Sequence, residues 1–277
     1  MTQGSPLAHI ITFTLPLLVG NLFQQFYNLV DSIVVGNYVG ADALAAVGTC
    51  GSLGFLFFSL SSGLAVGIGI LAAQYFGARD TEKIRATIAN STYILLLAGT
   101  AVSLFGFFGA SWLLHLLQVP EGIFPMSLSY LRVTSLGIVA VALYNGVASL
   151  LRALGDSKSP LYFLIFSCFL NIVLDLLFVL KLNMGVFGVG LATVISQAVS
   201  FLVSMVYAMT KVSYFRLSPQ EWKPQKQIIR RCMELGIPMA LQSTLISLST
   251  MVLQGVVNSF GQTVMAAYTV VGKVEQL

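Results

Sequence analysis

Charged residues are scarce in this sequence: lysine, arginine, aspartate and glutamate together make up 9% of it, whereas hydrophobic residues make up 57%. The mean hydropathy is +0.88. Soluble globular domains carry about 25% charged residues, so this composition excludes that class. It predicts a polytopic membrane protein instead. The net charge of +4 needs no nucleic-acid partner to explain it.

Cysteine and histidine are also rare, with three and two residues. Cys50, Cys168 and Cys232 show no CxxC or Cys/His spacing, so neither a zinc site nor a redox pair is expected. The HExxH, GxSxG and GxxxxGKS patterns are missing too, which argues against hydrolase chemistry and ATP-driven transport. We therefore expect no enzyme, no cofactor, and no metal beyond a sodium ion.

Long apolar runs fill the chain, and none shows the strict alternation of a barrel strand. Each is long enough for a helix of about 20 residues across a bilayer. The first run lacks the basic residues of a signal peptide, so we expect it to stay in the product. The sequence predicts an all-α fold with an eighth span beginning near Val264, after seven spans at residues 10–36, 44–75, 88–117, 123–151, 160–181, 186–210 and 234–260.

Basic residues gather in alternate connections between these spans. The connections after the second, fourth and sixth spans hold many lysines and arginines, whereas the other connections hold only Lys181. Because basic loops stay on the cytoplasmic side, this asymmetry predicts a cytoplasmic amino terminus. We expect a multi-pass protein of the cell (inner) membrane.

Residues 14–51 and 236–273 resemble each other: Pro16 aligns with Pro238 and Gly40 with Gly261, with one residue of slippage. This match predicts a parallel repeat about an axis along the membrane normal. We expect a six-helix lobe over residues 1–210, a basic cytoplasmic linker over 211–233 and the start of a second lobe over 234–277. Most of that second lobe would then be missing, because the sequence ends inside its second span. The alternative is that shared composition alone produces the match.

Two acids, Asp31 and Asp175, lie well inside the predicted spans. A charge at that depth costs at least about 2.5 kcal/mol and normally faces a cavity on an ion or substrate pathway. At about 1.5 Å per residue, Asp31, Asp175 and Thr193 fall in one layer about 10 Å below the outer surface. Asn171 precedes Asp175 by one helical turn and shares its helix face.

These four side chains predict a cation site. Carboxylates, an amide and a hydroxyl supply the oxygen ligands that a hard cation takes. Burial and like charge both disfavour two ionised carboxylates side by side. Such a pair can hold a proton or a sodium ion and exchange one for the other. The alternative is that each aspartate only forms a hydrogen bond to a neighbouring helix.

A polar stripe leads along the first span to Asp31, and the fourth span adds a further amide at Asn145. The stripe consists of Gln24, Tyr27 and Asn28. Each of these side chains either lines a substrate cavity or packs between helices.

Proline and glycine mark two further features of the spans. Pro16 lies within the first span, where its missing N–H loosens one turn and produces either a hinge or a fixed kink. Gly63, Gly67 and Gly69 give the second span the small-residue spacing that indicates close helix packing.

Five segments resemble the MATE (multidrug and toxin extrusion) transporters in order and placement, particularly the bacterial branch of the DNA-damage-inducible type. They are LPLLVGNLFQQFYNLVDSIVVGNYVGADALAAVG, QYFGARD, LLRALGDSKSP, NIVLDLLFVL and GVGLATVISQ. The resemblance covers the whole chain. It implies two six-helix lobes around a central cleft, of which this chain holds the amino-terminal lobe, helix 7 and part of helix 8. It also implies an antiporter that exports cationic amphipathic drugs and toxins in exchange for H+ or Na+.

Residue by residue, the resemblance implies a cation-coupling site and a substrate cavity. The coupling site would comprise Asp31, Asn171, Asp175 and Thr193; the cavity would include Gln24, Tyr27, Asn28 and Asn145; the hinge would be Pro16. The expected partners are cationic substrates, membrane lipid and the carboxy-terminal lobe of the same protein.

Two other functions stay open at this point. A lipid-linked oligosaccharide flippase of the same superfamily should line its cleft with basic residues, but the predicted spans offer only Arg132, near a span end. An intramembrane aspartyl protease should carry a GxGD motif within a span. The single Gly-Asp pair, Gly155-Asp156, lies in a predicted loop.

Overall fold

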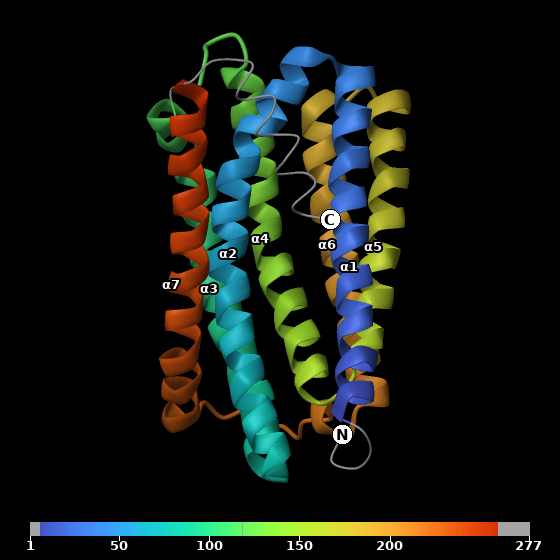
Figure 1. Cartoon of the computed structure of the whole chain (residues 1–277), viewed down its shortest axis with the longest axis vertical. Helices are drawn as coiled ribbons and strands as arrows, with labels where there is room; N and C mark the ends of the chain where they lie inside the picture. Colours follow the sequence, from blue (N-terminus) through green and yellow to red (C-terminus); the bar gives the residue numbers. More distant parts are fainter. Residues whose placement is uncertain (1–5, 118, 260–277) are drawn as a thin grey trace.

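The computed structural model describes residues 6–117 and 119–259. Within these ranges the chain is a bundle of seven long α-helices without a strand (Figure 1). The helices are α1 (Pro6–Val34), α2 (Ala41–Gly77), α3 (Thr81–Leu116), α4 (Phe124–Ala153), α5 (Lys158–Leu176), α6 (Gly185–Lys211) and α7 (Lys226–Ser259). Short π-helical turns extend α1 over Val35–Val39 and α5 over Leu177–Lys181.

Five of these helices, α2 to α6, are long and apolar enough to cross a membrane, counting α5 with its π-helical turn. Large apolar side chains point outwards from them. Leu97 and Phe108 of α3 are each 75% exposed, and Trp112, one helical turn after Phe108, is 60% exposed. Lipid tails solvate such side chains at no cost, so the chain is a multi-pass membrane protein.

Local sequence signals place the helix ends. The carboxylate of Asp80 accepts a hydrogen bond from the backbone N–H of Lys83 at 3.1 Å and caps α3. Pro125 occupies the first turn of α4, where no backbone donor is needed. Gly40 separates the π-helical turn from α2. Its φ of 121° is a backbone conformation that residues other than glycine rarely adopt.

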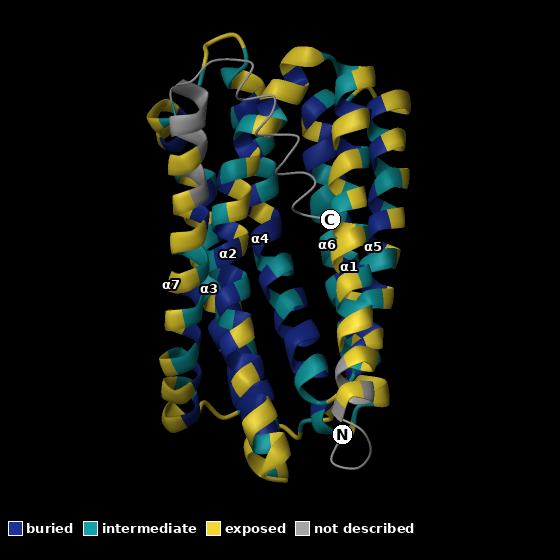
Figure 2. Cartoon of the chain, in the orientation of Figure 1, coloured by how far each residue is buried: buried dark blue, intermediate teal, exposed yellow. Residues whose placement is uncertain are grey.

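The core of the bundle lies along α2, α3 and α4, which together carry most of the buried positions of the described residues (Figure 2). The expected close packing at the glycines of α2 is confirmed. A Cβ atom on Gly63 would lie 2.5 Å from the backbone nitrogen of Ala240, and one on Gly67 would lie 2.5 Å from that of Gly236. The backbones of α2 and α7 therefore touch directly, and no larger residue fits between them.

Small residues of α7 form the other side of this contact. Its buried positions follow every fourth residue at Ile228, Cys232, Gly236 and Ala240. Ser247 is a further buried position of α7, and its hydroxyl lies 2.7 Å from the hydroxyl of Ser59 on α2. This stripe keeps one face of α7 on α2 along much of its length.

The connection between α6 and α7 is hydrogen-bonded to Arg85, in the first turns of α3. The Arg85 guanidinium donates to both carboxylate oxygens of Glu221 and to the backbone carbonyls of Ser213 and Arg216. The same carboxylate accepts from the backbone N–H of Ser218 at 2.6 Å. All of these groups are paired with one another, so the connection has a defined course.

Two more contacts hold the end of this connection. The hydroxyl of Tyr93 donates to the carbonyl of Trp222 at 2.8 Å, and the two rings meet edge to face. The buried amide of Asn90 accepts from the backbone N–H of Gln225 at 2.9 Å, directly before α7 begins. Together they fix where α7 starts.

α1, like α7, is exposed over much of its length (Figure 2). Among its described side chains, only Gly20, Asp31 and Val34 are buried. It packs chiefly against α5. Pro16 lies inside α1 and Pro238 inside α7, as the proposed repeat requires, whereas the expected eighth span lies outside the described residues.

Candidate functional site

The structure brings the four predicted cation-site residues together between α1, α5 and α6. The amide of Asn171, with its nitrogen facing the carboxylates, donates to Asp31 Oδ1 at 3.0 Å and to Asp175 Oδ2 at 3.1 Å. Its oxygen accepts from the backbone N–H of Thr193 at 3.3 Å. Asn171 therefore links two acids on different helices and ties both to the third helix.

This cluster is buried and has no basic partner. Asp31 is 9% exposed, and Asn171 and Asp175 are fully buried. The two carboxyl groups lie within hydrogen-bonding reach of each other. No lysine or arginine of the described part of the chain forms an ion pair with either acid. A buried pair of acids without a counter-charge is stable only when a proton or another cation compensates it.

One carboxylate oxygen of the cluster stands out. Asp175 Oδ1 is buried and accepts no hydrogen bond, although almost all buried side-chain oxygens do. Asn171 already donates both amide hydrogens to the acids, so it cannot serve this oxygen as well. The chemistry of Asp175 Oδ1 thus fits an acid proton or a bound cation.

Tyr27 extends the cluster along α1. Its hydroxyl donates to Thr193 Oγ1 at 3.4 Å, and Thr193 Oγ1 in turn donates to the carbonyl of Val189 at 3.1 Å. Thr193 therefore contributes its backbone N–H to Asn171 and its hydroxyl to Tyr27. The cluster and the predicted cavity residue are parts of one hydrogen-bonded network.

Both helices that carry the acids end in π-helical turns. Val35 begins such a turn one helical turn after Asp31, and Leu177 begins another two residues after Asp175. π-Helical turns are rare and occur frequently at functional sites. Each turn changes the direction of the residues that follow the acid. Sequence reasoning did not predict these turns.

A cavity of about 280 Å³ opens beside the cluster. All four predicted cavity residues line it: Gln24, Tyr27, Asn28 and Asn145. Asp31 and Thr193 also face it, whereas Asn171 and Asp175 lie behind them. Asp31 therefore forms part of one wall of the cavity, and none of the residues that line it is a lysine or arginine.

Sequence reasoning missed several other residues that line this cavity. Tyr130 and Thr134 of α4 and Gln197 of α6 line it, as do Phe57 and Phe58 of α2. A signal was present for Gln197, because it follows Thr193 by one helical turn. Tyr130 and Thr134 have the same spacing on α4. The aromatic residues gave no such signal, since phenylalanine is common throughout the spans.

Pro16 does not contact the cluster. It precedes Asp31 by about 22 Å along α1, at 1.5 Å per residue. It lies instead where α1 passes α4 and α5, beside a smaller cavity. Any effect of Pro16 on the acids must therefore act through the course of α1.

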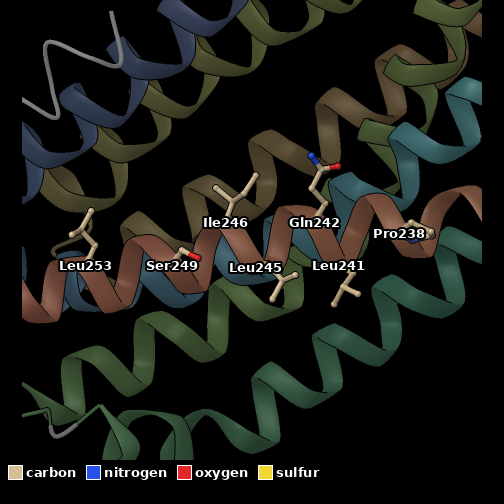
Figure 3. A pocket seen from close by; sticks show the side chains of 7 residues that line it. All are labelled: Pro238, Leu241, Gln242, Leu245, Ile246, Ser249 and Leu253. Atoms are coloured by element: carbon tan, nitrogen blue, oxygen red, sulfur yellow. The ribbon is translucent and has the colours of Figure 1, made fainter.

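A third hollow lies on the outer face of α7, and Figure 3 shows its side chains. Leu241 and Leu245 point to one side of the helix, while Gln242 and Ile246 point to the other (Figure 3). None of its lining residues is an acid or a base. The lining of this hollow therefore carries no charged side chain.

Comparison with known proteins agrees with this architecture. The family model MatE matches residues 16–177. The chain is 33% identical to the probable multidrug resistance protein YpnP of Bacillus subtilis, over the whole chain and 62% of that protein. The chain thus spans about three fifths of the length of the curated relatives it matches.

Solved structures share the fold as well. A MOP superfamily transporter from Pyrococcus furiosus, whose binding pocket of reversed polarity is said to suggest a different function, superposes with a TM-score of 0.91 and 26% identity. This match covers 99% of the chain and 61% of that structure. A multidrug resistance MATE transporter in an outward-facing conformation gives a TM-score of 0.86 and 27% identity, over 93% of the chain and 57% of that structure.

Proposed function

Since this chain belongs to the MatE family of transporters, which are not enzymes, we propose that the full-length protein exports cationic amphipathic drugs and toxins in exchange for H+ or Na+. The observation that carries this proposal is the pair of buried acids, Asp31 and Asp175, joined by Asn171 without any basic partner in the described chain. A purely structural hydrogen-bonded pair would not leave a buried carboxylate oxygen without a donor.

In this proposal the cluster binds the coupling cation and the neighbouring cavity binds substrate. Asp31 belongs to both, because it accepts from Asn171 and also faces the cavity. A cation on the cluster would neutralise the wall that attracts a cationic substrate. Binding of the ion and binding of the substrate would therefore compete, as antiport requires.

Alternating access would then supply the direction of transport. Two lobes, of which residues 1–210 form the first and residues from 234 on begin the second, would rock about a central cleft in the inner membrane. With a cytoplasmic amino terminus, the cluster lies nearer the outer surface and takes up its ion from outside. The membrane potential favours inward movement of that ion by about 2.3 kcal/mol per charge for each 100 mV.

Pro16 would serve as the hinge in this cycle. α1 buries few side chains and packs chiefly on α5, so a bend at Pro16 would disrupt little other packing. Such a bend would move Tyr27 and Asp31 together, because both follow Pro16 on the same helix. The cavity would change its shape while the cluster takes up its ion.

The flippase alternative finds no support in the described residues. A site for pyrophosphate needs basic side chains, and the cavity beside the cluster has none in its lining. Arg132 of α4 lies in a different groove, beside the ring of Phe107.

The test is export of a fluorescent cationic dye from cells that express the full-length protein, with external pH and sodium varied separately. We expect Asp175→Asn to abolish the response of export to the coupling ion, because the asparagine side chain carries no negative charge. Whichever ion the parent responds to is then the coupling ion.

Asp42→Asn is the matched control, since Asp42 is an exposed acid in the first turn of α2. It should export like the parent. If Asp175→Asn is made, inserted in the membrane and exports with the parent's ion response, the proposed coupling site is wrong.

A further inference from the structure

A second, smaller polar cavity lies along the line where α1 passes α4. Its volume is about 100 Å³, and side chains of α1, α4 and α5 line it. It shares Gln24, Tyr144, Asn145 and Leu164 with the larger cavity beside the acids. The two cavities therefore adjoin each other at these four side chains. We call the smaller one the α1–α4 seam.

Two side chains of the seam carry hydrogen-bond donors, the amide of Asn145 and the half-buried guanidinium of Arg152. Asn145 Nδ2 is buried and donates to no described group. Arg152 lines the seam at the end of α4 and forms no ion pair with a described acid. Sequence reasoning had placed Arg152 in a loop, whereas α4 continues to Ala153 and brings it into the bundle. A buried donor such as Asn145 Nδ2 is normally satisfied by water.

The seam also extends to one end of the bundle. Arg152 lies in the last turn of α4, and Ser157 and Pro160, which begin the next helix, line the same cavity. A cavity of this size has room for several water molecules. The seam thus extends from the larger cavity, which Asp31 lines, to the loop between α4 and α5.

We propose that the α1–α4 seam is a water-filled route by which the coupling ion leaves the cluster toward the cytoplasm. This inference rests on the proposed function, because it requires that Asp31 and Asp175 hold that ion. The ion passes to the waters of the seam and then to bulk water beyond Arg152, and it leaves both carboxylates charged. Gln24 and Asn145, which face both cavities, form the narrow point of the route.

The seam owes its existence to the way α1 packs. α1 rests on α5, and few of its side chains are buried. Gly20 leaves the space on the α5 side open, since a Cβ atom there would meet Leu164 at 3.5 Å and Leu161 at 3.6 Å. These are ordinary contact distances, so alanine fits at residue 20, but a larger side chain would enter the seam.

Access of a water-soluble reagent to Ala148 tests the route without any measurement of transport. Ala148 lines the seam and not the larger cavity. In the full-length protein with its own cysteines replaced, Ala148→Cys is treated with aminoethyl methanethiosulfonate on inside-out vesicles, with free cysteine trapped in the lumen. We expect it to react at least tenfold faster than Leu18→Cys, which faces outward from α1.

Gly20→Leu should slow this reaction at least tenfold by filling the seam, and Gly20→Ala should leave it unchanged. Equal rates for Ala148→Cys and Leu18→Cys, or no effect of Gly20→Leu, would overturn the route. A reaction from the opposite side only would also overturn it. Failure of the coupling site is a separate result, because it is measured by dye export with Asp175→Asn and leaves these rates untouched.

Discussion

The two sides of α4 use polar residues in opposite ways (Figure 1). On the side of α2, α3 and α7, the acid Glu221 is held by the guanidinium of Arg85 and by Ser218. On the side of α1, α5 and α6, the acids Asp31 and Asp175 share one amide and have no basic partner among the described residues. An acid that has its base contributes to structure, whereas a buried pair of acids without one is stable only when a proton or another cation compensates it.

Helix packing differs in the same direction. α7 touches the backbone of α2 through Gly63 and Gly67, and nothing can move between them without separating the helices. α1 leaves cavities on the side that faces α4 and ends in a π-helical turn. The first side therefore resembles a rigid frame, and the second has the space that a moving helix needs.

The largest expected effect is on the close contact between α2 and α7. Gly67→Ala would place a Cβ atom 2.7 Å from the backbone carbonyl carbon of Leu235, and backbone cannot yield as a side chain can. We expect the free energy of unfolding to fall by about 2 kcal/mol, in the range for overpacked cores. Thermal unfolding of the purified protein in detergent measures it.

Gly48→Ala is the control for that substitution, because a Cβ atom at Gly48 of the same helix meets nothing within 4 Å. It should stabilise α2 slightly through helix propensity. Equal unfolding temperatures for the two variants would mean that the contact between α2 and α7 is not tight.

The second prediction removes the amide that joins the acids. Asn171→Leu leaves Asp31 and Asp175 without their shared donor, and it removes the tie to the backbone of Thr193. We expect the ion response of dye export to fall at least tenfold, because the carboxylates are no longer held together for one cation. Full export with an unchanged ion response would show that the amide has no part in ion binding.

The third prediction makes the same asparagine-to-leucine substitution at Asn90 of α3, on the rigid side of the bundle. Asn90 is as fully buried as Asn171, but its amide donates to the carbonyl of Ala86 at 2.7 Å and accepts from Gln225. Asn90→Leu should therefore lower the free energy of unfolding by about 1 kcal/mol, the cost of an unpaired backbone donor. Export by the protein that remains folded should keep the ion response of the parent. A shifted ion response would contradict the division of the bundle into a rigid frame of α2, α3 and α7 and a second side, of α1, α5 and α6, that binds the ion.

Much of this fold is predictable from hydropathy alone, because a lipid-facing helix must be apolar along its whole span. All seven predicted helices that fall in the described residues are present. Their ends differ most at α7, which begins at Lys226 rather than near residue 234. Hydropathy detects only the apolar part of a helix, and the first turns of α7 carry lysine and arginine.

The cluster was also predictable, since depth and helix spacing placed Asp31, Asn171, Asp175 and Thr193 in one layer. The hydrogen bonds within the cluster were not predictable. The link that Asn171 makes between two helices depends on how α1 and α5 are rotated, and a single sequence does not record rotation. The position of Arg152 was missed for a related reason, because a basic residue near a span end is normally assigned to water.

The smallest expected effect concerns the contacts that Arg85 and Ser218 make with Glu221 in the connection between α6 and α7. We call this set of contacts the clamp. The Arg85 guanidinium, followed by the N–H and hydroxyl of Ser218, lowers the pKa of Glu221 from its usual value to about 2. A carboxyl group with a lowered pKa stabilises the folded form above its unfolded pKa of about 4.3, and this stabilisation is lost as the pH falls toward 2. The clamp should therefore loosen in acid.

Trp222 reports on the clamp, because its ring packs edge to face on Tyr93. With Trp112→Phe as background, the fluorescence anisotropy of Trp222 should fall as the pH is lowered from 6 to 3. Glu221→Gln should remove most of that pH dependence, since glutamine stays neutral throughout. Glu234→Gln is the control, because the ion pair of Glu234 with Arg230 is exposed and should contribute little. A pH step of equal size in Glu221→Gln would mean that another group holds the connection, and Arg85 would then lose its place in the frame.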